Sequence, residues 1–108
     1  MSAAKLDRTL AALAAPCRRR IVDLLRERPR RAGELAAATR TSFPAVSRHL
    51  RALRESGLVD EQRAAFDSRV RVYRLRPQPM AELKAWLDRT EAAWAHQLVA
   101  FREHVRKR

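Results

Sequence analysis

The sequence has little of several residue types, and each shortage excludes some classes of protein. Cys17 is its single cysteine, so no disulfide can form within one chain and we expect a reducing compartment. Two glycines are too few for a Gly-rich loop around a nucleotide phosphate. No apolar segment follows a basic start, and no run approaches the ~18 apolar residues of a membrane span. We therefore predict a soluble, cytoplasmic protein without a membrane partner.

The same shortages argue against an enzyme and against a resident metal. A chain of 108 residues is expected to form one domain, residues 1–108, without a deep, enclosed cleft. It has no pair of carboxylates and no Ser–His–Asp arrangement suited to catalysis, so we predict no catalytic residue. Three scattered histidines and one cysteine cannot form a zinc site within one chain, so we predict no metal site and no cofactor. A metal shared across a dimer interface stays open.

Positive charge is what the sequence has in excess. The formal net charge is +12, and 21 of the 24 basic residues are arginine, whose planar guanidinium suits phosphates and guanine edges. Residues 18–31 and residues 40–76 each carry a net charge of +5, whereas residues 77–108 carry +2. Codon bias in a GC-rich genome can explain arginine in place of lysine, but it cannot explain the excess of basic over acidic residues. The excess predicts a polyanionic partner for the middle of the chain.

Apolar spacing predicts three short helices in the first forty residues. The first covers residues 3–14 and has a narrow seam of leucines. The second begins at Pro16 and ends at Arg28, because the residue before a proline disfavours the helical region. The third covers about residues 32–39 and is followed by a tight connection.

The segment SFPAVSRHLRALRESG, residues 42–57, predicts a fourth helix with two different sides. Ser42 is a good N-cap, Pro44 is tolerated in the first turn, and Gly57 supplies a left-handed C-terminal stop. The apolar stripe that faces the core is Val46, Leu50 and Leu53. The outer face is then left to polar and basic side chains.

After Gly57 the apolar period changes to that of β-strands. We predict a strand over Leu58–Gln62, a turn-like connection over residues 63–68, and a second strand over residues 69–76, which together form a basic hairpin. The core side of the second strand is predicted to be Val70, Val72 and Leu75, and the outward arginines are Arg69, Arg71, Arg74 and Arg76. The alternation slips at Tyr73–Arg74, which predicts a bulge or the end of tight pairing there.

A last, long helix is predicted over about residues 79–105. Its apolar positions are close to a heptad seam and comprise Met80, Leu83, Leu87, Trp94, Leu98, Phe101 and Val105. The aromatic residues of this helix are Trp86, Trp94 and Phe101. They either form the core of a dimer or line an apolar pocket for an effector. The fold class is therefore mainly α with a small β-hairpin, in the order α-α-α-α-β-β-α.

A short helix and a tight turn before a helix with a polar outer face form a helix-turn-helix, and the basic hairpin is a wing. The fourth helix can then enter a major groove with its N-terminus first. Its DNA-binding residues are predicted to be Ser42, Phe43, Ser47, Arg48 and Arg51. Phe43 would contact a thymine methyl group, and Arg69 and Arg71 of the wing would contact phosphates or a narrow minor groove. Whether His49 contacts DNA stays open.

Residues 10–75 resemble the ArsR-type winged helix-turn-helix family of bacterial transcriptional repressors. The similar segments are LAALAAPCRRRIVDLL (10–25), GELAAAT (33–39), PAVSRHLRALRESGLV (44–59) and VYRL (72–75). The resemblance implies a homodimer formed by the first and last helices, and an operator with two half-sites. It also implies DNA contacts at Ser42, Phe43, Ser47 and Arg48, and on the wing around residues 63–71.

The sequence departs from the pattern of that family in two places. Many members have Gln at the position of Phe43, so their base preference does not transfer to this chain. Metal-sensing members have two cysteines just before the Glu-Leu of the short helix, where this chain has Arg31 and Gly33. The residues of the alternative metal site on the last helix lack the required spacing: Asp88, His96 and His104. The resemblance is therefore to a subgroup that lacks the metal-binding cysteines.

From these observations we predict a sequence-specific transcriptional regulator, a homodimeric repressor on a palindromic operator. Its partners are double-stranded DNA and a second copy of the chain, and no effector is identifiable from the sequence. The predicted dimer-interface residues are Leu6, Leu10, Leu83, Leu87, Trp94, Leu98 and Phe101. Two alternatives are a winged-helix module that docks an acidic protein and a non-specific DNA-coating protein.

Cys17 lies at the start of the second helix, where the helix dipole and Arg18–Arg20 favour the thiolate. It is therefore a candidate redox residue, although the chain lacks a second, resolving thiol. The alternative is that Cys17 is a small residue that fills a gap in the first turn.

Overall fold

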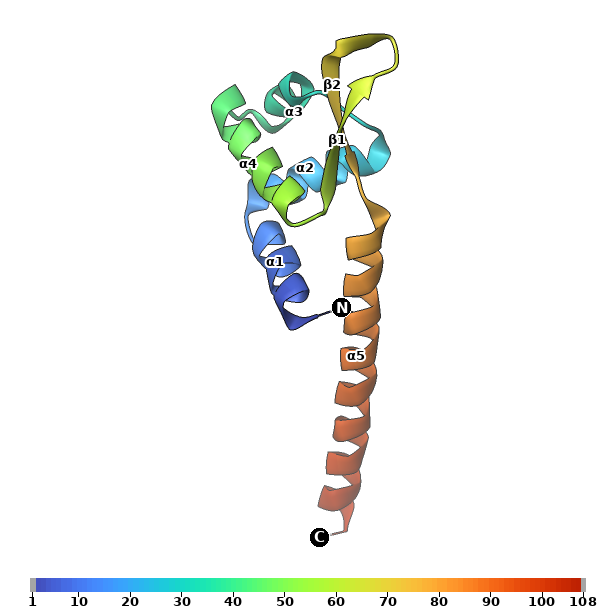
Figure 1. The fold of residues 1–108 in the computed structure, drawn as a ribbon. Coiled ribbons are helices and arrows are strands. Elements are labelled where there is room, and N and C mark those ends of the chain that lie inside the picture. The colour runs from blue at the N-terminus through green and yellow to red at the C-terminus, as the bar shows by residue number, and fades with distance from the viewer. Residues whose placement is uncertain (1, 108) are drawn as a thin grey trace.

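The computed structural model describes residues 2–107 and confirms the predicted order of elements (Figure 1). The elements are α1 (Ala3–Leu13), α2 (Pro16–Glu27), α3 (Ala32–Thr39), α4 (Phe43–Glu55), β1 (Val59–Ala64), β2 (Asp67–Leu75) and α5 (Pro77–Arg106). Helices α1 to α4 and the base of the hairpin form the body of the molecule, from which the hairpin and α5 project (Figure 1). We call the hairpin, residues 59–75, the wing.

Local chemistry sets the ends of the helices. Ser42 caps α4 as predicted, since its Oγ accepts a hydrogen bond from the Ala45 N–H at 3.3 Å. Gly57 ends that helix with a φ of 81°, in the left-handed region that favours glycine. Helix α5 begins at Pro77, two residues before the predicted start, because a proline is tolerated in a first turn that follows extended Arg76.

The core lies where α2, α3, α4 and β1 meet. The largest fully buried side chains are Ile21, Leu35, Val46, Leu50, Leu53, Leu58 and Thr9. The predicted stripe of α4 is therefore confirmed as core. Because α4 is held by this stripe, its opposite face is fixed in orientation and remains exposed to solvent.

The wing differs from the prediction in its turn and in its register. Its strands pair without interruption from Val59↔Leu75 to Arg63↔Arg71, and the connection between them is only Ala65–Phe66. The prediction of a bulge or of the end of tight pairing at Tyr73–Arg74 is therefore wrong, and the irregularity lies between Arg63 and Ala64. The strands extend into the segment that was predicted to be a loop.

The uninterrupted register also changes which side of β2 faces the core. Tyr73 and Leu75 share one face and pack against the core, whereas Val70 and Val72 lie on the other face with Arg74. The prediction that Val70 and Val72 face the core is therefore wrong. Tyr73 is held in place by its backbone, which exchanges hydrogen bonds of 2.8 and 3.0 Å with Arg30 just before α3.

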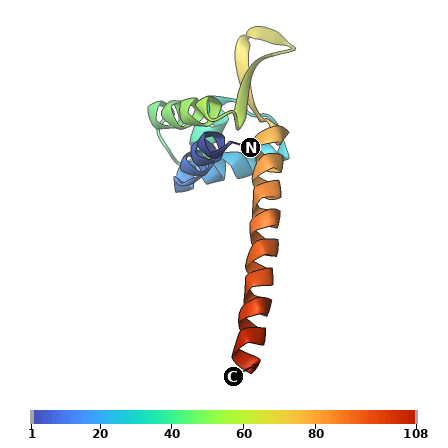
Figure 2. The same ribbon diagram turned by 60° about the horizontal axis from the view of Figure 1, so that its bottom comes forward.

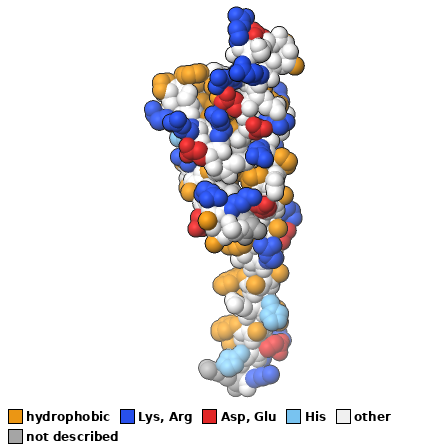
Figure 3. Space-filling view, viewed as in Figure 1, with side chains coloured by type: hydrophobic (Ala, Val, Ile, Leu, Met, Phe, Trp, Pro, Cys, Tyr) orange, Lys and Arg blue, Asp and Glu red, His pale blue; other side chains and the backbone are white. Residues whose placement is uncertain are grey.

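Helix α5 packs on the body only through its first turns. Leu83 is buried, and Glu82 forms an ion pair with Lys5 of α1 at 3.1 Å. From Leu87 to Lys107 every side chain is exposed, and the helix projects alone from the body (Figure 2). Apolar side chains lie along the projecting part of the helix (Figure 3). No helix within residues 2–107 has the length and apolar character needed to cross a membrane.

Candidate nucleic-acid interface

The turn between α3 and α4 sets the angle at which α4 is presented. Arg40 adopts a left-handed conformation with a φ of 53°, and its N–H bonds back to the carbonyls of Ala36 and Ala37. Thr41 donates a second backbone bond to Ala36 O at 3.0 Å. This short connection places α4 directly after α3 in the arrangement of a helix-turn-helix.

The predicted DNA-binding side chains of α4 lie on one exposed face. This outer face of α4 consists of Ser42, Phe43, Ser47, Arg48 and Arg51, all of which are exposed. Phe43 is 59% exposed although it is aromatic, and it lies in the first turn of the helix. The face therefore combines two hydroxyl groups, two cations and one apolar side chain on the exposed side of α4.

The two arginines of this face carry charge that the chain does not neutralise. Within residues 2–107, no ion pair involves Arg48 or Arg51. Because long, unpaired guanidinium groups are exposed and can form bidentate hydrogen bonds, they are suited to phosphate oxygens and guanine edges.

The arginines of the wing are arranged differently, because three of the four have an acidic partner, while Arg63 donates to the Ser68 carbonyl at 2.8 Å. Arg71 contacts Glu61 at 2.7 Å, and Arg69 contacts Asp67 at 3.1 Å. The bond from Arg69 also lowers the pKa of the Asp67 carboxyl below its ordinary value. The structure thus leaves both predicted wing contacts exposed but already paired.

Glu61 is a residue of this surface that the sequence analysis missed. Its carboxylate accepts bonds from Arg71 of β2 and from the Tyr73 hydroxyl, and it pairs with Arg54 of α4 at 2.9 Å. These groups line a hollow of about 300 Å³ between α4 and the wing, which also includes Arg48 and Arg51. The signal in the sequence is only that Glu61 faces Tyr73 once the strand register is known.

His49 lies on the side of α4 that faces α2, not on the outer face. Its Nδ1 accepts a hydrogen bond of 3.3 Å from Arg18 Nε, and its side chain is half-buried. Burial first, and then the charges of Arg18 and Arg48, lower the pKa of His49 below its ordinary value. A neutral imidazole at this position thus links α4 to α2.

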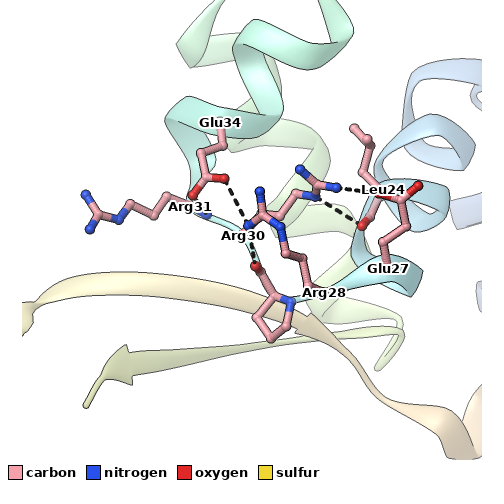
Figure 4. A network of polar contacts seen from close by, with 7 residues as sticks. Leu24, Glu27, Arg28, Arg30, Arg31 and Glu34 are labelled. Atoms are coloured by element: carbon pink, nitrogen blue, oxygen red, sulfur yellow. Dashed lines mark hydrogen bonds and ion pairs between the residues drawn. The ribbon is translucent and has the colours of Figure 1, made fainter. Parts of the chain in front are cut away.

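Several arginines of residues 18–31 form hydrogen bonds and ion pairs within the chain. Arg30 has only 13% of its side chain exposed; it donates to the Leu24 carbonyl at 3.1 Å and pairs with Glu27 at 2.6 Å (Figure 4). Arg28 pairs with Glu34 in the first turn of α3 at 3.2 Å. The connection from α2 to α3 is therefore held by arginines that are paired within the chain.

Comparisons with known proteins agree with this geometry. Residues 15–61 match the model of the bacterial regulatory protein, arsR family. The chain is 39% identical over 99 residues to the HTH-type transcriptional regulator Rv2034 of Mycobacterium tuberculosis, covering 92% of this chain and 87% of that protein. The chain belongs to the ArsR family. It is a transcriptional regulator with a winged helix-turn-helix DNA-binding domain, and it is not an enzyme.

Solved structures place this ArsR-family regulator among winged helix-turn-helix proteins. An ArsR-like transcriptional regulator from Rhodococcus sp. RHA1 is 27% identical, and the match covers 97% of this chain and 94% of that one with a TM-score of 0.85. The homodimeric winged helix-turn-helix DNA-binding domain of Mb0332 from Mycobacterium bovis is 30% identical, covers 82% of this chain and 79% of that one, and has a TM-score of 0.64.

The predicted dimer residues of the regulator lie in two different environments. Leu83 is buried against the regulator's own body, and Leu6 is half-buried. The others present exposed apolar side chains: Leu10, Leu87, Trp94, Leu98 and Phe101. Trp94 and Phe101 are 61% and 66% exposed, which is unusual for large aromatic residues.

Cys17 of the regulator lies in the first turn of α2, next to the turn between α3 and α4. It is half-buried against the core, and its Sγ is 3.7 Å from Thr41 Oγ1 in the turn before α4. Within residues 2–107, no group of three or more His, Cys, Asp and Glu side chains is arranged to hold a metal ion.

Proposed function

We propose that this regulator is a homodimeric repressor that binds a palindromic operator with α4 of each protomer in a major groove. The observation that carries the proposal is the outer face of α4, where Arg48 and Arg51 are exposed and unpaired within residues 2–107. A helix of this kind fits the width of the major groove of B-DNA, which shows a distinct pattern of hydrogen-bonding groups for each base pair.

The chemistry of each side chain suggests its role. Arg48 can bond two acceptors of a guanine, while Arg51, about one turn later, suits a phosphate. Ser47 is short enough to permit close approach, and Ser42 supplies a hydroxyl at the helix start. Phe43 offers an apolar surface to a thymine methyl group. Arg69 and Arg71 are then secondary phosphate contacts of the wing, because binding requires them to leave an acidic partner.

The exposed side of α5 supports the homodimer. Leu87, Trp94, Leu98 and Phe101 recur at spacings of seven, four and three residues, so they form one stripe along the helix. Burying one Trp or Phe side chain removes roughly 150–250 Å² of surface from water, which strongly favours association. The Mb0332 domain, described as homodimeric, is similar over most of the chain. A dimer would present two copies of α4 to half-sites whose centres are about 10 bp or a multiple apart.

The dimer is tested by light scattering on Phe101→Asp. We expect this variant to be a monomer at a concentration at which the wild type is a dimer, because a buried carboxylate would oppose burial of the stripe. His96→Asp is the matched control, since His96 lies about 200° around the helix from Trp94. Equal masses for Phe101→Asp and the wild type would contradict a dimer through this stripe.

The operator is tested by selecting bound sequences from a pool of random duplexes. The proposal predicts enrichment of two inverted half-sites at the spacing of a helical turn or a multiple of it. Binding without enrichment would favour a DNA-coating protein, and no binding would favour a module that docks a protein partner. Transcription from a promoter that contains the selected site should then fall when the regulator is added, and a rise would contradict repression.

A further inference from the structure

Glu61 occupies an unusual position for an acidic residue of a DNA-binding surface. It lies between the outer face of α4 and the wing, with 15% of its side chain exposed. Its Oε1 is 2.7 Å from Arg71 Nη1, its Oε2 is 2.9 Å from Arg54 Nη1, and the Tyr73 hydroxyl donates to the same Oε2 at 3.2 Å. One carboxylate thus joins α4 to both strands of the wing.

The other acidic residues of the wing lack these properties. Asp60 pairs with Arg74 at 3.1 Å, and Asp67 pairs with Arg69 at 3.1 Å. Each therefore has a single arginine partner, and that arginine lies within the wing itself. Only Glu61, among the acidic residues of the wing, connects the wing to the helix that carries the outer face.

The contacts of Glu61 with Arg54 and Arg71 are chemically similar to contacts between arginine and phosphate. A carboxylate oxygen accepts a charge-assisted hydrogen bond from a guanidinium as a phosphate oxygen does, and each arginine here contacts one oxygen of Glu61. Arg54 and Arg71 each use one Nη on Glu61, so a phosphate must displace the carboxylate before their full charge contributes to DNA affinity. The remaining carboxylate would then lie unpaired near the DNA backbone, whose charge it opposes.

We propose that Glu61 determines the selectivity of DNA binding by holding Arg54 and Arg71 away from the phosphates of any duplex. This inference rests on the proposed function. It assigns Glu61 two effects. Glu61 lowers the sequence-independent part of the affinity, because it occupies two cations. It also fixes the position of the wing relative to α4, which the base contacts of α4 require.

The test is Glu61→Gln, which keeps the shape and the hydrogen bond to Tyr73 but removes the charge. We expect the variant to bind random duplex roughly 10-fold more tightly, with a salt dependence of log K steeper by about one unit or more. Affinity for the selected operator should change less, because the wing is no longer held, so the ratio of specific to random affinity falls. Fluorescence anisotropy at several salt concentrations measures all three quantities.

Asp60→Asn is the matched control, since it makes the same change of charge on the neighbouring residue, whose partner Arg74 lies on the other face of the wing. It should alter random-duplex binding by less than about 2-fold. Equal gains for Asp60→Asn and Glu61→Gln would show a plain effect of net charge and would overturn the proposal. An unchanged affinity and salt slope for Glu61→Gln would also overturn it.

A second measurement keeps the inference testable if Glu61→Gln does not fold, which circular dichroism would show. In the otherwise unchanged chain, Arg54→Ala should leave the salt slope on random duplex within about 0.3 units of the wild type, because Glu61 holds Arg54. A slope flatter by about 0.9 would mean that Arg54 already contacts phosphate and would overturn the assignment. If the wild type binds no duplex even at low salt, the proposed function itself fails, and this outcome differs from all the others.

Discussion

The outer face of α4 and the wing both carry exposed arginines, but the wing pairs three of its four with acidic residues. Arg48 and Arg51 have no ion pair within residues 2–107, whereas Arg69 and Arg71 of the wing are held by Asp67 and Glu61. A count of charges cannot distinguish the two regions. The arrangement of partners does, and it is the basis of our proposal that α4 supplies the strong contacts to DNA while the wing supplies contacts that are restrained.

The largest change in operator affinity is expected for a substitution of Arg48. Arg48→Ala should weaken binding to the operator by about 1–3 kcal/mol, because a bidentate contact to a base is lost. Random duplex should lose less, since no base contact contributes there. Competition in a mobility-shift assay measures both affinities. Equal losses on the two duplexes would mean that Arg48 contacts only phosphate.

The next largest effect is expected on the free energy of unfolding, through the cap of the helix that carries the unpaired arginines. Ser42→Ala should lower the free energy of unfolding by about 1 kcal/mol, because the cap of the Ala45 N–H is lost. Ser47→Ala on the same face should change it by less than about 0.5 kcal/mol, since the Ser47 hydroxyl is exposed and has no hydrogen bond within residues 2–107. Urea unfolding of both variants decides whether the cap fixes the start of α4.

A direct comparison of one arginine from each region follows. Arg51→Ala should flatten the salt dependence of log K by about 0.9 per lost phosphate contact. Arg71→Ala should lower the affinity for all duplexes by less than about 0.5 kcal/mol and flatten the slope less, because its exposed ion pair with Glu61 already engages the charge. If Arg71 proves the more important of the two, the contrast between α4 and the wing is broken.

The smallest effect is expected on the pH dependence of stability, and it comes from His49 on the side of α4 that faces α2. Because the pKa of His49 lies below its ordinary value, the unfolded chain takes up this proton before the folded chain as the pH falls. His49 therefore makes the free energy of unfolding decrease as the pH falls below about 6.5, and it has no effect at higher pH. Urea unfolding at about pH 7.5 and about pH 5.5 should show a smaller loss for His49→Gln than for the wild type. Equal losses for the two proteins would show that His49 does not contribute to the pH dependence of stability.

The sequence was sufficient wherever a local rule decides the structure. The limits of α3, the cap at Ser42 and the stop at Gly57 follow from periodicity, a short hydroxyl side chain and a left-handed glycine. The stripe of α4 and the exposure of its arginines follow from the period of the helix. Each of these features depends on residues within a few positions of one another.

The sequence was insufficient where distant segments decide the structure. Tyr73 was predicted to interrupt β2, but its backbone pairs with Arg30, which lies more than forty positions away in the chain, so the strand continues. The side of β2 that faces the core then reverses for Val70 and Val72. The role of Glu61 depends on α4, β1 and β2 meeting at one point, which no local pattern shows.

The proposed function requires that the outer face of α4 contacts bases. Selection from random duplexes with the wild type and with Arg48→Ala tests this claim most directly. We expect the variant to lose its preference at one position in each half-site, symmetrically, while the other positions keep theirs. An identical sequence profile for the two proteins, at any affinity, would contradict the claim.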